Sequence, residues 1–328
     1  MIFVDNQGKT DPSLNLAAEE YLLRQVMPGE DILLFYINEP SIIIGRNQNT
    51  LEEINQSYVE AHQIHVVRRL SGGGAVYHDL GNLNFSFISP NTPENVLNFQ
   101  KFTAPVIRCL RDMGVAAELS GRNDIVVDGR KISGNAQYIA GKRMVSHGTL
   151  LFDSDLSRVS EALNVKQSKI ASKGIKSVRS RVANISEFLV EPMDIKAFRT
   201  RLLYSLFESG RMQEYRLTGS DWQAILTLAD ERYRRWDWNY GRSPDFNVQK
   251  TQRFPGGEIE ARIDVQAGFI QQVKFYGDFF GQGDLSELEA KLAGARYTSG
   301  DLAAALKDMD VSLYFSGLSN QELLDLLY

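Results

Sequence analysis

Residues 121–137 read GRNDIVVDGRKISGNAQ and place an Asp-Gly pair between two short apolar runs. An Asp-Gly pair in this setting predicts a two-residue β-hairpin turn, because both residues accept the positive φ angles that the turn requires. The turn sets which residues of the two strands face each other. The predicted pairs are Val127 with Arg130, Val126 with Lys131, Ile125 with Ile132, and Asp124 with Ser133.

Lys131 and Asp124 are diagonal neighbours in this pairing, and the alternation of side chains along a strand places them on one face of the hairpin. The opposite face is apolar and carries Ile125, Val127 and Ile132. A lysine held on rigid strands can stabilise negative charge that develops on a phosphate, while the aspartate orients it or binds Mg²⁺. An exposed cross-strand ion pair would have the same pattern, so the hairpin alone leaves a catalytic pair and a surface pair open.

A second unusual stretch, residues 68–79, reads RRLSGGGAVYHD and contains three consecutive glycines beside two arginines. Glycines lack Cβ atoms, so the backbone N–H groups of such a loop can approach a phosphate or a carboxylate closely. The loop lacks the Gly-Lys-Ser/Thr ending of a Walker loop and does not match a dinucleotide-binding fingerprint. It is therefore interpreted either as an anion-binding loop of another type or as a flexible hinge with solvated arginines.

Two further features carry polar or charged side chains. His147 begins an apolar stretch at residues 147–152, where its ring can bond a phosphate or a carbonyl group or serve as a buried structural histidine. Residues 166–181 contain six lysines and arginines and no acidic residue. Three interpretations of this run stay open: a loop that closes over a triphosphate, a surface that binds an acidic partner, and a solvated basic loop.

The composition argues against several classes of protein. The 328 residues carry a formal net charge of −5, whereas a nucleic-acid binder needs a basic face. We therefore expect no nucleic-acid partner. No apolar run approaches the length of a membrane span and no secretory leader is recognised, so we expect no membrane partner either. Cys109 is the only cysteine, which excludes an internal disulfide and favours a reducing cytoplasm. It lies in a helical pattern and is interpreted as a buried structural thiol.

The periodicity of apolar residues predicts that the chain contains both helices and strands. Helices are predicted at residues 13–26, 98–113, 193–209 and 221–235, and strands at residues 32–36, 41–44, 64–68, 83–88, 125–127, 130–132 and 147–152. Turn residues within 236–247 predict a boundary between domains 1–244 and 245–328. The second domain is predicted to be small and α+β, with strands at residues 258–265 and 269–275 and helices at residues 285–292, 301–309 and 320–327.

Five segments occur together in the order and spacing of one known family, namely residues 68–79, 81–85, 121–137, 147–152 and 173–182. On these segments the chain resembles the lipoate-protein ligase A family from about residue 11 to residue 190, with a weaker likeness through the tail. The resemblance implies an α/β (α+β) fold, in which a catalytic domain of the biotin and lipoate protein ligase type has mixed sheets flanked by helices. It also implies that the tail is the small accessory domain of bacterial lipoate ligases.

The resemblance implies roles for individual residues. Lys131 would contact both the lipoate carbonyl group and the α-phosphate of ATP, and Asp124 would lie near the phosphate and Mg²⁺. The residues implied in nucleotide binding are Arg69, Gly74, Ala75, Val76 and Tyr77. The residues implied in binding the lipoyl group are Arg46, Ser71, Gly72, Gly73 and His147.

The implied reaction uses ATP to convert lipoic acid to lipoyl-AMP and then transfers the lipoyl group to a lysine of an acceptor. The implied acceptors are lipoyl-domain proteins: the glycine-cleavage H protein, the E2 subunits of 2-oxoacid dehydrogenases, or both. Octanoyl and lipoyl transferases of the same fold rely on a nucleophilic cysteine, a role for which Cys109 is poorly placed. Biotin ligases carry a Gly-Arg-Gly-Arg type of loop that this sequence lacks. A non-catalytic lipoyl-domain-binding module stays open until turnover is measured.

Overall fold

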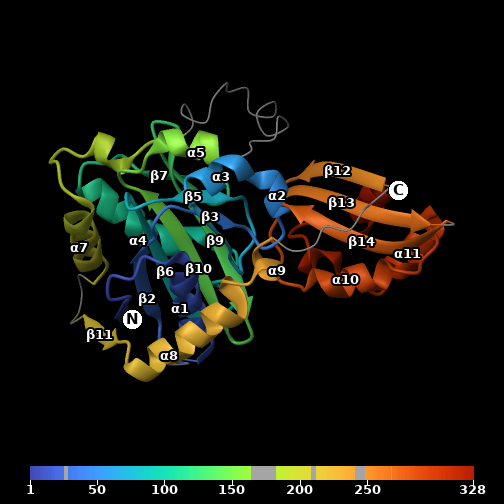
Figure 1. The fold of residues 1–328 in the computed structure, drawn as a ribbon, viewed down its shortest axis with the longest axis horizontal. Coiled ribbons are helices and arrows are strands. Elements are labelled where there is room, and N and C mark those ends of the chain that lie inside the picture. Colours follow the sequence, from blue (N-terminus) through green and yellow to red (C-terminus); the bar gives the residue numbers. More distant parts are fainter. Residues whose placement is uncertain (26–28, 164–181, 208–211, 241–247, 267) are drawn as a thin grey trace. The chain divides into compact units, whose positions relative to one another are not determined.

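The computed structural model describes residues 1–25, 29–163, 182–207, 212–240, 248–266 and 268–328, which divide into two compact units (Figure 1). The first unit comprises Met1–Ile43, Leu51–Arg68 and Val76–Asn239, and the second comprises Ile44–Thr50, Arg69–Ala75 and Tyr240–Tyr328. The predicted domain boundary after residue 244 and the basic run at residues 166–181 both lie outside the described residues. The glycine loop, Arg69–Ala75, belongs to the second unit, whereas the sequence-based division assigns it to the first domain.

The described part of the first unit contains an eight-stranded mixed sheet. Strand β1 runs parallel to both of its neighbours, and the remaining pairs are antiparallel. The strands in spatial order are β11 (Gln213–Arg216), β1 (Ile2–Asp5), β2 (Ile32–Ile37), β6 (Asn82–Pro90), β10 (Arg143–Leu151), β9 (Arg130–Ala140), β8 (Asp124–Val127) and β7 (Glu118–Ser120). A smaller sheet has the order β4 (His65–Arg68), β3 (Ser41–Ile44) and β5 (Val76–His78).

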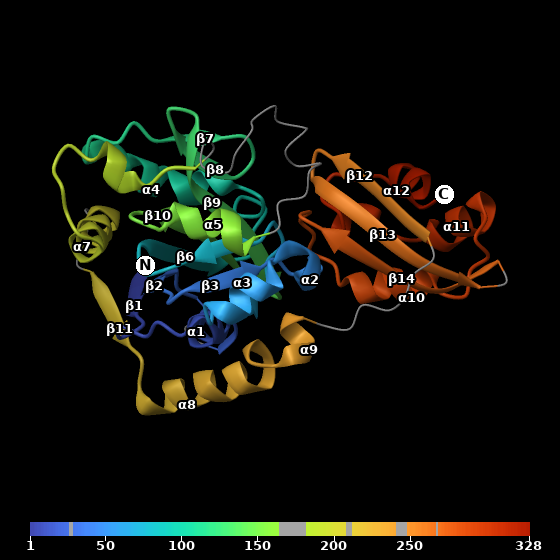
Figure 2. The ribbon, with the colours of Figure 1, turned by 45° about the horizontal axis from the view of Figure 1, so that its top comes forward.

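Both faces of the large sheet are covered, which explains why β2 is apolar throughout. Leu33 and Phe35 of β2 belong to one buried core, whereas Ile32 and Leu34 belong to another. This alternation is what a strand with two buried faces requires. The first core includes Cys109, which is buried as predicted. The covering helices are α4 (Phe99–Asp112) and α7 (Ile195–Leu206) in the first core, and α1 (Pro12–Gln25) and α8 (Gly219–Leu228) in the second (Figure 2).

Shorter elements complete the described part of the chain. They are α2 (Thr50–Glu53), α3 (Gln56–Ala61), α5 (Leu156–Ala162), α9 (Trp236–Asn239) and the 3₁₀ turns Ile185–Phe188 and Val311–Leu313. A π-helical turn, Ala229–Tyr233, follows α8 where the sequence predicts one uninterrupted helix. No helix in the described ranges has the length and hydropathy needed to cross a bilayer.

The last residues of the first unit are hydrogen-bonded to the strand that precedes the glycine loop. The backbone N–H of Arg68 donates to Asn239 Oδ1 at 2.9 Å. The indole N–H of Trp238 donates to the Arg68 carbonyl oxygen at 2.9 Å, and the Arg68 Nε–H donates to the Trp238 carbonyl oxygen at 2.9 Å. These hydrogen bonds therefore join the last residue of β4 to the last two residues of α9.

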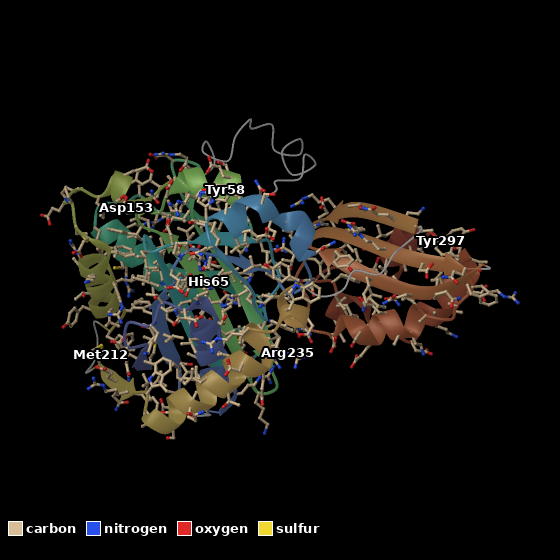
Figure 3. The ribbon with its side chains drawn as sticks, viewed as in Figure 1. Tyr58, His65, Asp153, Met212, Arg235 and Tyr297 are labelled. Carbon is tan, nitrogen blue, oxygen red and sulfur yellow. The ribbon has the colours of Figure 1, made fainter. Side chains whose placement is uncertain are left out.

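The second unit contains an antiparallel sheet and short helices. The strands are β12 (Val248–Phe254), β13 (Gly257–Gln266) and β14 (Phe269–Gly277), and the helices are α10 (Leu285–Leu292), α11 (Ser299–Leu306) and α12 (Asn320–Leu327). Strand and helix side chains share one buried core that includes Ile263, Val273 and Leu302. Tyr297, labelled in Figure 3, helps to hold the C-terminus, since its hydroxyl group donates to the Leu327 carbonyl oxygen at 2.7 Å.

Most predicted elements are confirmed, with end points that differ by a few residues. Two strands are much longer than predicted, because β9 runs to Ala140 and β10 begins at Arg143 around a turn at Gly141. The strands that the prediction omits are β1, β5, β7, β11 and β12. Strands β11 and β12 consist mainly of polar residues, since β11 has a partner only in β1 and β12 only in β13 among the described strands.

Candidate active site

The hairpin of β8 and β9 forms at the predicted turn. Asp128 and Gly129 have φ angles of +50° and +74°. The two pairs next to the turn, Val127 with Arg130 and Val126 with Lys131, are as predicted.

The outer pairs of the predicted register are wrong. A register shift lies between Ile125 and Val126, so that Ile125 faces Ser133 and Asp124 faces Gly134. One extra residue on β9 therefore stands opposite β8, as in a β-bulge. Ile132 and Ser133 are both fully buried next to this irregularity. A strict two-residue alternation would place these neighbours on opposite faces of the sheet.

The predicted proximity of Lys131 and Asp124 is confirmed in spite of the bulge. Lys131 Nζ lies 2.8 Å from Asp124 Oδ1, and the two side chains are 36% and 31% exposed. A Cβ atom at Gly134 would lie 2.8 Å from Lys131 Nζ, so glycine at this position leaves room for the ammonium group. The pair is held in place yet accessible to a ligand. Beneath it Ile125, Val127 and Ile132 are buried, as predicted.

Backbone and amide hydrogen bonds fix the base of the hairpin. The Asn135 N–H donates to the Asn123 carbonyl oxygen at 3.0 Å, and the Asn135 side-chain amide donates to the same oxygen at 2.9 Å. The Lys131 carbonyl oxygen accepts from the Ala183 N–H at 3.0 Å. These bonds hold the backbone that carries Lys131, so the ammonium group needs little reorganisation to meet a developing charge.

The guanidinium group of Arg69 lies inside the glycine loop. Its Nε–H donates to Ser71 Oγ at 3.0 Å, and its Nη2 donates to the carbonyl oxygens of Gly72 at 2.6 Å and Gly74 at 2.9 Å. The guanidinium group therefore sets the shape of the loop by binding its carbonyl groups. The predicted contact of Arg69 with a nucleotide stays a prediction.

The consecutive glycines differ in their surroundings within the second unit. A Cβ atom at Gly72 would lie 2.5 Å from the Phe279 carbonyl oxygen. Gly73 has a φ angle of +90°, and its N–H donates to the same carbonyl oxygen at 3.4 Å. A Cβ atom at Gly74 would meet no atom within 4 Å. Close packing thus explains Gly72 and Gly73, which is evidence against a flexible hinge, while Gly74 has open space for a ligand.

Arg46 and Ser71, both predicted to bind the lipoyl group, lie side by side in the second unit. The Arg46 N–H donates to the Ser71 carbonyl oxygen at 2.9 Å. Arg46 Nη2 lies 3.9 Å from Asp284 Oδ1. The Ser286 N–H and the nearby Arg46 charge both lower the pKa of Asp284. The guanidinium group of Arg46 therefore lies beside a carboxylate that stays ionised over a wide pH range.

The remaining predicted residues belong to the first unit, apart from the partly exposed Ala75 at the end of the loop. Val76 and Tyr77 begin β5, and burial raises the pKa of the Tyr77 hydroxyl. His147 Nδ1 lies 2.9 Å from each carboxylate oxygen of Glu19, and Glu19 also accepts a hydrogen bond from Ser86. Sequence reasoning missed Glu19. The one sign of Glu19 in the sequence is an acidic side chain within helix α1, most of whose residues are buried.

The donor set limits where a metal ion could bind. Within the described ranges, no group of three or more histidine, cysteine, aspartate or glutamate side chains is arranged to hold a metal ion. Mg²⁺ in phosphate-transfer sites is bound mainly by phosphate and water oxygens, with one or two protein carboxylates. Asp124, a partly exposed carboxylate beside Lys131, fits that single role.

Comparison with known proteins relates the chain to described families over nearly its whole length. The family model for the lipoyl protein ligase A/B catalytic domain matches residues 11–207, and the model for the bacterial lipoate protein ligase C-terminus matches residues 243–327. The chain is 55% identical to the lipoate-protein ligase LplJ of Bacillus subtilis, with all of both chains covered. It is 50% identical to lipoate–protein ligase 1 of Staphylococcus aureus, again with all of both chains covered.

Solved structures extend this likeness to the fold. LipL1 of P. falciparum, solved in complex with lipoate, superposes with a TM-score of 0.80 at 24% identity, covering 99% of this chain and 97% of that one. The lipoate protein ligase of a bipartite system from Thermoplasma acidophilum gives 0.65 at 30% identity, covering 75% and 98%. A lipoate-protein ligase A bound with ATP gives 0.61 at 29% identity, covering 74% and 97%. The chain therefore belongs to the lipoate–protein ligase family.

Proposed function

We propose that this protein is an ATP-dependent lipoate–protein ligase that activates lipoic acid as lipoyl-AMP and transfers the lipoyl group to a lysine of a lipoyl-domain protein. The observation that carries the proposal is the placement of Lys131. Its ammonium group lies 2.8 Å from Asp124 on a hairpin backed by a buried core. Relatives named lipoate-protein ligases match this chain along its full length, which makes acyl adenylation the reaction to assign to this lysine.

In the first step, a carboxylate oxygen of lipoate attacks the α-phosphorus of ATP. The new oxygen–phosphorus bond replaces the bond to the bridging oxygen, and pyrophosphate leaves with both electrons of that bond. Lys131 stabilises the charge that accumulates on the α-phosphate oxygens, and Asp124 orients the ammonium group. Arg69 and the N–H of Gly74 bind the nucleotide. Mg²⁺, when bound, neutralises phosphate charge, and Asp124 is the carboxylate that would hold it.

In the second step, the neutral ε-amine of the acceptor lysine attacks the carbonyl carbon of lipoyl-AMP. The nitrogen–carbon bond forms, the carbon–oxygen bond to the phosphate breaks, and AMP leaves while the amine loses a proton. Lys131 polarises the carbonyl oxygen during this step. Placing both reacting groups against one fixed cation reduces the entropy that each step must lose.

The proposed acceptors are lipoyl-domain proteins of the glycine-cleavage H protein and 2-oxoacid dehydrogenase E2 classes. One supporting observation is that the archaeal ligase of similar fold was studied with its E2 lipoyl domain. We also propose that the enzyme acts in the cytoplasm, where Cys109 stays reduced.

Lipoate-dependent exchange between ATP and labelled pyrophosphate tests the first step, and the intact mass of a purified lipoyl-domain acceptor tests the second. Exchange that requires lipoate, and a lipoyl adduct that requires ATP, are expected. An octanoyl or lipoyl transferase would modify the acceptor from an acylated donor protein without ATP and would show no exchange. Exchange that biotin supports better than lipoate would contradict the proposed substrate.

A further inference from the structure

The turn between β14 and α10, residues 277–284, is closely packed inside the second unit. A Cβ atom at Gly281 would lie 1.9 Å from the Tyr314 carbonyl oxygen, and one at Gly257 would lie 2.7 Å from the Cα atom of Phe279. The Phe280 carbonyl oxygen accepts from the Ser316 N–H at 2.8 Å. Separate chain segments therefore hold the backbone of this turn, which makes it a rigid support.

This turn contacts two loops that carry predicted substrate-binding residues, both in the same unit. The Phe279 carbonyl oxygen accepts from the N–H of Gly73 at 3.4 Å in the glycine loop. The Gly277 N–H donates to the Asn47 carbonyl oxygen at 2.8 Å in the loop Ile44–Thr50. The two loops also touch each other, since a Cβ atom at Gly45 would lie 1.9 Å from the Gly73 carbonyl oxygen.

The ring of Phe280 packs against the backbone of the glycine loop. Phe280 is 5% exposed. Its Cδ1 atom would lie 3.3 Å from a Cβ atom at Gly72, and its Cζ atom would lie 3.3 Å from one at Gly73. The ring therefore occupies the space into which side chains of the loop would otherwise project. Arg69 binds the loop through its carbonyl groups, whereas Phe280 supports it through van der Waals contact.

We propose that Phe280 is a positioning residue for the glycine loop, acting through Gly72 and Gly73 and touching neither substrate. The inference rests on the proposed function, because it takes the loop to bind ATP and the lipoyl group. A loop supported on one side by a rigid ring and on the other by Arg69 stays in its binding-competent shape. Without the ring the loop samples other shapes. The apparent affinity for ligands then falls in proportion to the fraction of molecules whose loop keeps the binding-competent shape.

The test compares Phe280→Ala with Leu302→Ala in the full-length protein. Leu302 is a buried core residue on α11, outside the turn, so its truncation tests general loss of stability in the same unit. Phe280→Ala should raise the KM values for ATP and lipoate on the order of 10-fold, with a smaller change in kcat. Leu302→Ala should lower the melting temperature while both KM values stay near wild type. Phe280→Leu, which retains much of the volume, should restore part of the affinity.

Hydrogen exchange of the glycine-loop amides gives a readout that does not depend on activity. In Phe280→Ala without ligand, the peptide covering residues 69–75 should exchange faster, while the hairpin at residues 124–131 keeps its wild-type rate. Unchanged exchange of the loop, or faster exchange with unchanged KM values, would overturn the positioning role. If wild-type protein shows no lipoate-dependent exchange of pyrophosphate, the proposed function fails, and the amide exchange still decides whether Phe280 orders the loop.

Discussion

The hairpin that carries Lys131 and the glycine loop obtain their shapes in different ways. In the hairpin, a two-residue turn sets the pairing of residues that are close in the sequence. In the glycine loop, Gly72 and Gly73 pack against Phe279 and Phe280, which are about 200 residues later in the chain. The local motif therefore predicts the turn of the hairpin and the two residue pairs next to it, whereas the shape of the glycine loop depends on a partner that no local pattern specifies.

The largest expected effect in this comparison follows from Lys131→Ala in the hairpin. Loss of the ammonium group should lower lipoate-dependent pyrophosphate exchange by about 100-fold to 1,000-fold, as for removal of one preorganised donor in other enzymes. Stability should change by less than about 1 kcal/mol, because the ion pair with Asp124 is partly exposed.

The neighbouring residue provides a matched control for this change. Arg130 lies 2.9 Å from Glu187 in an ion pair of similar exposure, so Arg130→Ala removes a comparable surface interaction. It should keep near-normal exchange. Near-normal exchange in Lys131→Ala would instead remove this lysine from its assigned role.

The next effect concerns the glycine loop and compares a closely packed glycine with one that has open space around it. Gly72→Ala should destabilise the protein by about 1–3 kcal/mol, because its new methyl group would overlap with the Phe279 carbonyl oxygen. Gly74→Ala should leave stability within about 0.5 kcal/mol, because its methyl group would enter open space. Urea unfolding measures both changes. Equal stabilities of the two variants would show that the loop does not depend on the turn.

A smaller effect is expected at the hairpin turn. Gly129 has a positive φ angle and open space around its Cα atom. Gly129→Ala should therefore cost about 1 kcal/mol through backbone strain alone, measurable as a lower urea midpoint. Asp128→Asn serves as the control, because asparagine accepts the same backbone conformation. A larger loss in Asp128→Asn than in Gly129→Ala would mean that the turn is not held by local backbone preference.

The smallest effect concerns the contact between Arg46 and Asp284 in the second unit. The pair is 3.9 Å apart and Asp284 is largely exposed, so Asp284→Asn should cost less than about 0.5 kcal/mol at neutral pH. Asparagine keeps the hydrogen bond to the Ser286 N–H, which isolates the charge. Because the pKa of Asp284 lies below its ordinary value of 3.8, its contribution is present above that value and is lost as the pH falls below it. Unfolding measured at neutral and acidic pH should therefore show the difference between variant and wild type shrinking in acid.

The outcome of the sequence-based predictions follows the same division between local and distant effects. Helices and buried strands were predictable because their apolar periodicity is strong, and the proximity of Lys131 to Asp124 was predictable because the Asp-Gly turn is a local signal. The bulge beside Ile132 was not, because the Asp-Gly turn sets only the pairs next to it and carries no signal for an extra residue farther along β9. Polar edge strands such as β12 lack the alternation on which strand prediction depends.

The candidate site was predictable only in part for a related reason. The three glycines predict a loop whose backbone needs the absence of side chains, but the reason differs between them. Gly72 packs against Phe279, whereas Gly74 has open space around it. A sequence pattern cannot separate these two cases, since both require the absence of a side chain. Glu19 was missed because its carboxylate becomes notable only when folding buries it beside His147.

The hydrogen bonds between Arg68 and Asn239 have a consequence for the tail. Arg68 is the last residue before the glycine loop and Asn239 the last before the tail, so both segments depart from a common anchor. Segments tethered at one origin meet at an effective concentration on the order of millimolar, without any need for tight intrinsic affinity. The contacts of Phe279 and Phe280 with the loop can therefore be individually weak and still be well populated. The same tail supplied as a separate polypeptide would have to reach that concentration to occupy the loop equally well.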